Sequence, residues 1–220
     1  MTELRLIGGA AVAEPAVVEA PPVRLPPGRH GIPADIVRAH QRQRLLEAAA
    51  AALDEQGYGR LTAARVTELA GVSSRTFYQH FEDLWACLLA AYEVEAGHLC
   101  GEIESSCAAL SDDDARARAR AGIAAALGFL AEEPAVARLL SAEPPPQIAA
   151  LAAARRDLVE RLSAMLRDAL AAAGPTPLPG LERRLVAAAL ALVSARAADG
   201  DPERLRALEP ELTELLLASL

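Results

Sequence analysis

Apolar residues recur at helical spacing along most of this chain, and proline or glycine separates one such run from the next. The runs are rich in alanine, which is the best helix former. Aromatic residues, which favour strands, make up only 3% of the 220 residues. This combination excludes a β-sandwich or barrel. It predicts an all-α fold of about nine helices with no strands.

The prolines and the change in texture divide the chain into three predicted parts. Residues 1–34 are rich in proline, which lacks a backbone donor, and are expected to form a flexible N-terminal arm. Residues 35–82 contain the first strong helix and two short ones. Residues 83–220 contain the remaining helices and are expected to form a separate C-terminal domain.

Capping and breaking residues predict where several helices begin and end. Asp35 is expected to cap the first helix and Gly57 to end it. The last two helices are expected at about 180–198 and 202–219. Pro210 falls inside the second of these and is expected to kink or restart it.

The two short segments form the most informative motif of the sequence. Thr62 is a good cap for a helix over 63–70, and Ser73 is a good cap for a helix that runs to about His80. Between them, Gly71 permits the positive φ that a tight turn requires. Two short helices joined in this way predict a helix-turn-helix.

The second helix of such a motif enters the major groove of DNA and reads bases with its outer face. Arg75 suits a bidentate contact to guanine, Gln79 a contact to adenine, and Thr76 a thymine methyl or a phosphate. Tyr78 and His80 are better placed for backbone phosphates. The predicted DNA-binding residues are Thr62, Ser73, Ser74, Arg75, Thr76, Tyr78, Gln79 and His80.

Several of these residues also have a simpler interpretation. Tyr78 fits a half-buried packing role, His80 a helix cap, and Arg75 a solvated surface charge. Phe77 and Phe81 are expected in the core, with no DNA contact.

A longer pattern surrounds the motif, with fixed points at Leu45-Leu46, Ala48-Ala49, Gly57-Tyr58, Thr62, Val66, Ala70-Gly71-Val72-Ser73, Thr76-Phe77-Tyr78 and His80-Phe81. This pattern resembles the DNA-binding domain of TetR-type (TetR/AcrR) transcriptional regulators. The stretch from Leu25 to Gly31 is similar to arms of some actinobacterial members. The resemblance implies a sequence-specific regulator, a ligand-responsive repressor that releases operator DNA when it binds a small molecule.

The resemblance also implies partners. These are palindromic double-stranded operator DNA, a small apolar or amphipathic ligand, and a second copy of the chain bound through the last two helices. Candidate pocket residues in the C-terminal part are Trp85, Tyr92, His98, Phe129 and Met165, with ordinary core packing as the alternative interpretation. The other interpretation of the whole chain is a helical small-molecule-binding protein that has lost DNA binding.

Two departures from the family pattern bear on that choice. The family often has a lysine near the start of the fourth helix, where this chain has Leu84 and Trp85, so a phosphate contact is in doubt there. A glycine that is frequent in the family is Arg75 here, which adds a long cation to the recognition helix.

Charge is distributed unevenly along the chain. The formal net charge is −8, and all 22 basic residues are arginine. Residues 21–82 hold eight arginines against six acids, so the predicted DNA-binding segment is mildly basic and the acid excess lies elsewhere. The predicted N-terminal arm carries Arg24, Arg29 and His30, which could bind in a minor groove of DNA. The alternative is an arm that makes no DNA contact.

The sequence offers little for other function classes. It has no nucleophile motif, phosphate loop or metal-ligand spacing, so we expect no enzyme, no cofactor and no metal site. No apolar run is long enough for a membrane span, and nothing resembles a secretory signal, so a cytoplasmic location is expected. Cys87, Cys100 and Cys107 are expected to be small buried hydrophobes, with a redox sensor as the alternative.

Overall fold

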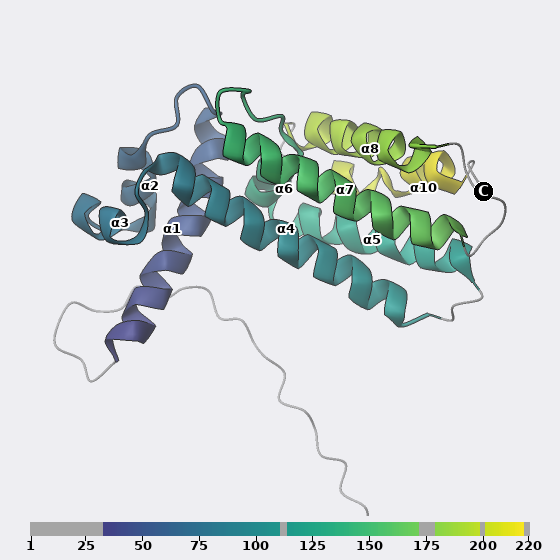
Figure 1. The fold of residues 1–220 in the computed structure, drawn as a ribbon, viewed down its shortest axis with the longest axis horizontal. Helices are drawn as coiled ribbons and strands as arrows, with labels where there is room; N and C mark the ends of the chain where they lie inside the picture. Colours follow the sequence, from purple (N-terminus) through teal and green to yellow (C-terminus); the bar gives the residue numbers. More distant parts are fainter. Residues whose placement is uncertain (1–32, 111–113, 172–178, 199–200, 218–220) are drawn as a thin grey trace, which may run out of the picture.

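The computed structural model describes residues 33–110, 114–171, 179–198 and 201–217, and all regular structure in these ranges is helical. Figure 1 shows an elongated molecule with the short helices α2 and α3 at one end. The long helices α4, α5 and α7 run side by side away from that end, and α8 and α10 cover them. The expected all-α fold is therefore confirmed.

The N-terminal helices are α1 (Ala34–Gln56), α2 (Ala63–Ala70) and α3 (Ser74–His80). Gly57 ends α1 with φ 66, as expected. Asp35, however, is not the cap of this helix. Pro33 occupies the cap position without a side-chain hydrogen bond, and Asp35 lies in the first turn, where its charge suits the helix dipole.

The C-terminal helices follow the proline breaks closely. They are α4 (Leu84–Ala108), α5 (Ala115–Glu132), α6 (Pro134–Ser141), α7 (Ala149–Ala171), α8 (Leu181–Ala197), α9 (Pro202–Arg206) and α10 (Glu209–Leu217). Pro210 does restart the last predicted helix, because it lies in the first turn of α10, where a missing N–H costs no hydrogen bond. The helix expected over 202–219 is thus divided into α9 and α10.

One hydrophobic core joins the two ends of the molecule. A continuous cluster of buried side chains runs from Leu45 in α1 to Leu212 in α10. Helix α4 carries much of it, with Leu88, Tyr92 and Leu99 each no more than 2% exposed. Helix α4 therefore packs against α1 as well as against the helices of the C-terminal part.

No helix within the described ranges is both long and apolar enough to cross a membrane.

Candidate nucleic-acid interface and ligand cavity

The turn between α2 and α3 is built by the capping residues that the sequence predicts. The hydroxyl of Thr62 accepts a hydrogen bond from the Arg65 N–H at 3.2 Å, and the hydroxyl of Ser73 accepts one from the Thr76 N–H at 3.1 Å. Gly71 takes the left-handed conformation with φ 60. These short-range bonds fix the angle between the two helices.

The outer face of α3 is polar and open to solvent. Ser74, Arg75 and Gln79 are exposed, and Tyr78 is 62% exposed. The inner face is apolar, with Phe77 fully buried. The helix therefore presents the predicted contact residues on one surface, held by an aromatic anchor.

The other predicted residues lie at the edges of this surface. Thr62 and Ser73 are exposed at the starts of α2 and α3, and both hydroxyls serve as caps. Thr76 and His80 are half-buried. Thr62 thus caps α2, and the other seven predicted residues lie on α3 or at its cap.

The structure separates the nearby arginines into two groups. Arg44 donates a hydrogen bond to the carbonyl of Ala70, and so ties α1 to the turn. Arg65 pairs with Glu55 at 2.8 Å and with Glu68 at 2.9 Å. These two arginines stabilise the domain, and their side chains are not presented to a partner.

Arg38 and Arg42 belong to the other group, and neither was among the predicted contact residues. Both are exposed on the N-terminal half of α1. The Arg42 guanidinium lies 5.0 Å from the centre of the Phe81 ring, just after α3. Burial, followed by the charges of Arg38 and Arg42, lowers the pKa of His80. Arg38 and Arg42 are four residues apart, just before the first buried leucine of α1. This spacing was the feature of the sequence that could have predicted a shared basic face.

The predicted arm residues Arg24, Arg29 and His30 lie outside the described residues.

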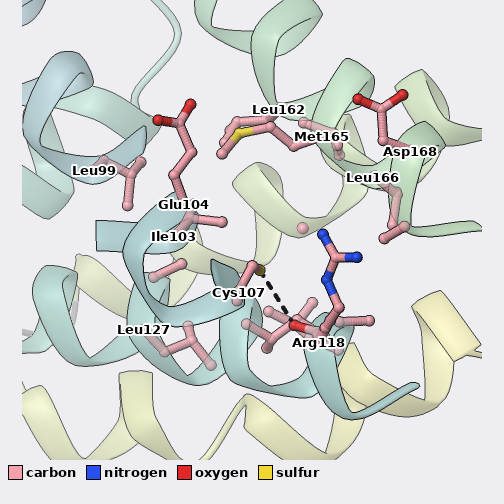
Figure 2. A pocket seen from close by; sticks show the side chains of 18 of the residues that line it. Leu99, Ile103, Glu104, Cys107, Arg118, Leu127, Leu162, Met165, Leu166 and Asp168 are labelled. Atoms are coloured by element: carbon pink, nitrogen blue, oxygen red, sulfur yellow. Dashed lines mark hydrogen bonds between the residues drawn. The ribbon is translucent and has the colours of Figure 1, made fainter. Parts of the chain in front are cut away.

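A cavity of about 420 Å³ lies among α4, α5, α7, α8 and α10. This volume falls in the range of roughly 300–1,000 Å³ that is usual for small-molecule sites. Most of its lining is aliphatic, including Leu99, Leu127 and Leu166. Figure 2 shows the charged side chains of Glu104, Arg118 and Asp168 among them. The cavity suits a mostly apolar molecule with a polar part.

Of the five predicted pocket residues, only Met165 lines this cavity. Tyr92 is buried in the core at 1% exposure, and Trp85 and Phe129 pack against that core. His98 points to solvent and meets the carboxylate of Glu95 at 3.2 Å. Aromatic character was therefore a poor guide, because this cavity is lined by aliphatic side chains from helices distant in sequence.

Cys107 also lines the cavity, and its thiol donates to the carbonyl of Arg118 at 3.4 Å (Figure 2). The other two cysteines are buried, as expected. Burial raises the pKa of the Cys87 thiol to about 12 and also raises that of Cys100. Both are poorly reactive as a result, since the thiolate is the nucleophile.

A polar cluster connects the residues after α1 with α4 and α7; its tyrosine hydroxyls are buried, and its one carboxylate, Glu143, is exposed. The hydroxyls of Tyr58 and Tyr92 and the Nε of Arg155 are buried without a hydrogen-bond partner in the described structure. Arg155 also pairs with Glu143 at 3.0 Å. Burial is the largest cause that raises the pKa of Tyr58, to about 12, and that of Tyr92 still further. We call Tyr58, Tyr92, Glu143 and Arg155 the polar joint.

Residues 45–91, which contain this helix-turn-helix, match the family model described as bacterial regulatory proteins, tetR family. Over these residues the chain is similar to the DNA-binding domains of TetR-type transcriptional regulators. A curated relative, the HTH-type transcriptional regulator BetI of Yersinia pestis (strain Pestoides F), is 37% identical over 81 residues. That match covers 37% of this chain and 41% of the relative, so it spans about two fifths of the curated protein.

Solved structures resemble this chain over most of its length. The transcriptional regulator FadR of Bacillus subtilis, solved with stearoyl-CoA, gives a TM-score of 0.67 at 17% identity. The match covers 81% of this chain and 98% of FadR. A TetR-like regulator from Rhodococcus sp. RHA1 gives 0.64 at 17% identity, covering 90% of this chain and 100% of that protein. At such identities the likeness concerns the fold.

Proposed function

We propose that this chain is a homodimeric, ligand-responsive transcriptional regulator that binds palindromic operator DNA and releases it when a small molecule occupies the cavity. The observation that carries the proposal is the exposed polar face of α3, set by two side-chain caps beside an open basic face of α1. In this proposal residues 35–82 bind DNA and residues 83–220 bind the ligand and the second copy. Residues 1–34 form an arm.

A second copy would supply the second half-site. The outer sides of α8 and α10 form a shallow hollow lined by Ala188, Ala191, Leu192 and Leu215, with Glu211 and Glu214 at its edge. Exposed alanines let two helices approach closely, and a two-fold axis here would relate two α3 helices. Analytical ultracentrifugation should give a dimer, and Ala191→Arg should give a monomer with weakened DNA binding.

The lining of the cavity and the stearoyl-CoA complex of FadR together support a ligand with a long apolar part. Helices α4 and α7 extend from the cavity to the polar joint, where Tyr92 and Arg155 lie near Tyr58 at the end of α1. A ligand that prefers one position of these helices would shift the two α3 helices out of the spacing that fits DNA. In this proposal the regulator is a repressor.

DNA binding is tested by selecting operators from a random DNA library with the full chain. We expect a two-fold symmetric consensus with two half-sites. Arg75→Ala should change the preferred base at one position of each half-site and weaken binding by about 1–3 kcal/mol. If the full chain binds no DNA at low salt, it is instead a ligand-binding protein without DNA binding.

Ligand binding can be followed through Cys107. Because Cys87 and Cys100 are buried with a raised pKa, a thiol reagent on the folded chain should report mainly on Cys107. Fatty acids and acyl-CoA thioesters of increasing length are suitable probes. An occupant of the cavity should slow the labelling of Cys107 and raise the melting temperature.

A cavity-filling variant provides the control for that experiment. Ala126 lines the cavity, so Ala126→Leu should abolish the protection by the probe. Ala124 lies on the exposed side of the same helix, so Ala124→Leu should keep it. If both variants respond as the wild type does, the probe binds outside this cavity.

A further inference from the structure

The N-terminal half of α1 projects beyond the packed part of the molecule. Figure 1 shows the start of α1 extending past α2 and α3. The first buried residue of this helix is Leu45, and Ile36 is 54% exposed. Because these early turns bury little, core packing does not account for the side chains that they carry.

Arg38 and Arg42 lie on this projecting segment, one helical turn apart. Arg42 is held over the face of Phe81, with 5.0 Å from its guanidinium carbon to the ring centre. Such a cation–π contact orients the guanidinium and leaves its N–H groups available to a further partner. Phe81 is the residue directly after α3, so Arg42 lies beside the recognition helix.

His80, the last residue of α3, belongs to the same cluster. Its ring centre lies 6.3 Å from that of Phe81, over which Arg42 is held, and burial followed by the charges of Arg38 and Arg42 lowers its pKa. No ion pair with an acid holds Arg38 or Arg42 among the described residues, whereas Arg65 is held by Glu55 and Glu68. The charge of the cluster is therefore open to an outside anion.

The other flank of α3 differs in character. Glu82 and Asp83 are exposed there, and the Asp83 carboxylate accepts a hydrogen bond from the Ala86 N–H at 2.8 Å. Leu84 and Trp85 are half-buried and apolar. This side carries no cation at the start of α4, so an anion beside α3 is attracted to the α1 side.

We propose that Arg38, Arg42 and His80 form a binding site for the DNA backbone phosphates that flank the bases contacted by α3. The inference rests on the proposed DNA binding, and it identifies the residues that bind the phosphates. The arginine fork suits a phosphate, which it can contact with two N–H groups at once. Residues four apart on a helix lie about 6 Å from each other, so the pair can hold one phosphate or two neighbours.

The test is the salt dependence of DNA binding by the Arg38→Ala/Arg42→Ala double variant. Alanine preserves the helix, so folding should be unaffected. With a random-sequence duplex and the full chain, we expect affinity to fall at least about tenfold. The slope of log affinity against log salt should become shallower by about two per protomer. Base preference, measured by selection, should stay that of the wild type.

The Arg116→Ala/Arg120→Ala double variant is the charge-matched control, because both arginines are exposed on α5 within the C-terminal bundle, four residues apart. It should leave both affinity and slope unchanged. Arg75→Ala is the contrasting variant, since it should change base preference. If the double variant keeps the wild-type slope, or changes base preference as Arg75→Ala does, the phosphate site is wrong.

The His80 ring gives a second readout, by NMR titration of the full chain. In the free protein, the double variant should raise the pKa of His80, because two repelling charges are gone. In the DNA complex of the wild type, a phosphate in the cluster should raise it too. An unchanged His80 pKa in the complex would overturn the site while leaving DNA binding intact. Absence of any DNA binding by the wild type would overturn the proposed function as well.

Discussion

The turn between α2 and α3 and the interior behind it treat their polar groups differently. Around α2 and α3, hydroxyls and arginines bond to groups close by, such as Ser73 to Thr76 and Arg44 to Ala70. Where the residues after α1 meet the bundle, the polar joint keeps two tyrosine hydroxyls buried without a partner in the described structure, and the bundle itself holds an aliphatic cavity. The bonds around α2 and α3 hold these helices in one geometry. The unpaired hydroxyls of the polar joint and the empty cavity leave room for a change of conformation.

The largest expected difference between the two regions concerns their packing. Phe77 is fully buried, so Phe77→Ala should lower the free energy of unfolding by about 3–5 kcal/mol. Leu127 is equally inaccessible at 2% exposure but lines the cavity. Leu127→Ala should cost only about 2 kcal/mol, because that side already lacks neighbouring atoms. Urea denaturation measures both, and equal losses would show that the cavity wall is as tightly packed as the helix-turn-helix.

The second difference appears at high pH. The pKa of Tyr58 is about 12 in the folded chain, against about 10 when unfolded. Stability from this group is full below pH 10 and is lost as pH rises from about 10 through 12, on the order of 2 kcal/mol. Tyr58→Phe should reduce the alkaline loss measured by urea denaturation at several pH values.

Tyr78 provides the control for that titration. It is 62% exposed on α3, so Tyr78→Phe should leave the alkaline loss unchanged. If both variants behave alike, Tyr58 is more hydrated than its burial implies.

Capping gives a smaller effect, located in the helix-turn-helix. Ser73→Ala removes the hydroxyl that accepts the Thr76 N–H at 3.1 Å, and should cost about 1 kcal/mol. It should also weaken DNA binding, because the start of α3 frays. Ser73→Asp keeps an acceptor and should restore the stability, which thermal unfolding can measure. If Ser73→Ala loses no stability, the cap does not hold α3.

The same contrast explains what could be predicted from the sequence. Thr62, Ser73 and Gly71 act on their near neighbours, so the local sequence alone was enough to predict their roles. Arg42 and Phe81 are 39 positions apart and meet only after α1 and α3 pack, so this contact was not predicted.

The cavity was the least predictable feature. Its lining comes from five helices, and most of its members are leucines and alanines that equally suit a core. Only the packing of those helices decides which of them face an empty space. Aromatic residues such as Tyr92 and Phe129 stood out in the sequence, yet they serve the core.

The smallest stability effect has the opposite sign to that of Ser73→Ala. Tyr92 is 1% exposed, and its hydroxyl has no partner in the described structure. Removing a buried, unpaired hydroxyl relieves its desolvation cost, so Tyr92→Phe should stabilise the fold by up to about 1 kcal/mol. It should also alter the response of DNA affinity to a cavity ligand, since the joint links α4 to α1. If Tyr92→Phe instead destabilises the chain, an ordered water molecule binds the Tyr92 hydroxyl in the polar joint. The two regions would then differ in how their polar groups are satisfied, by protein groups around α3 and by water in the joint.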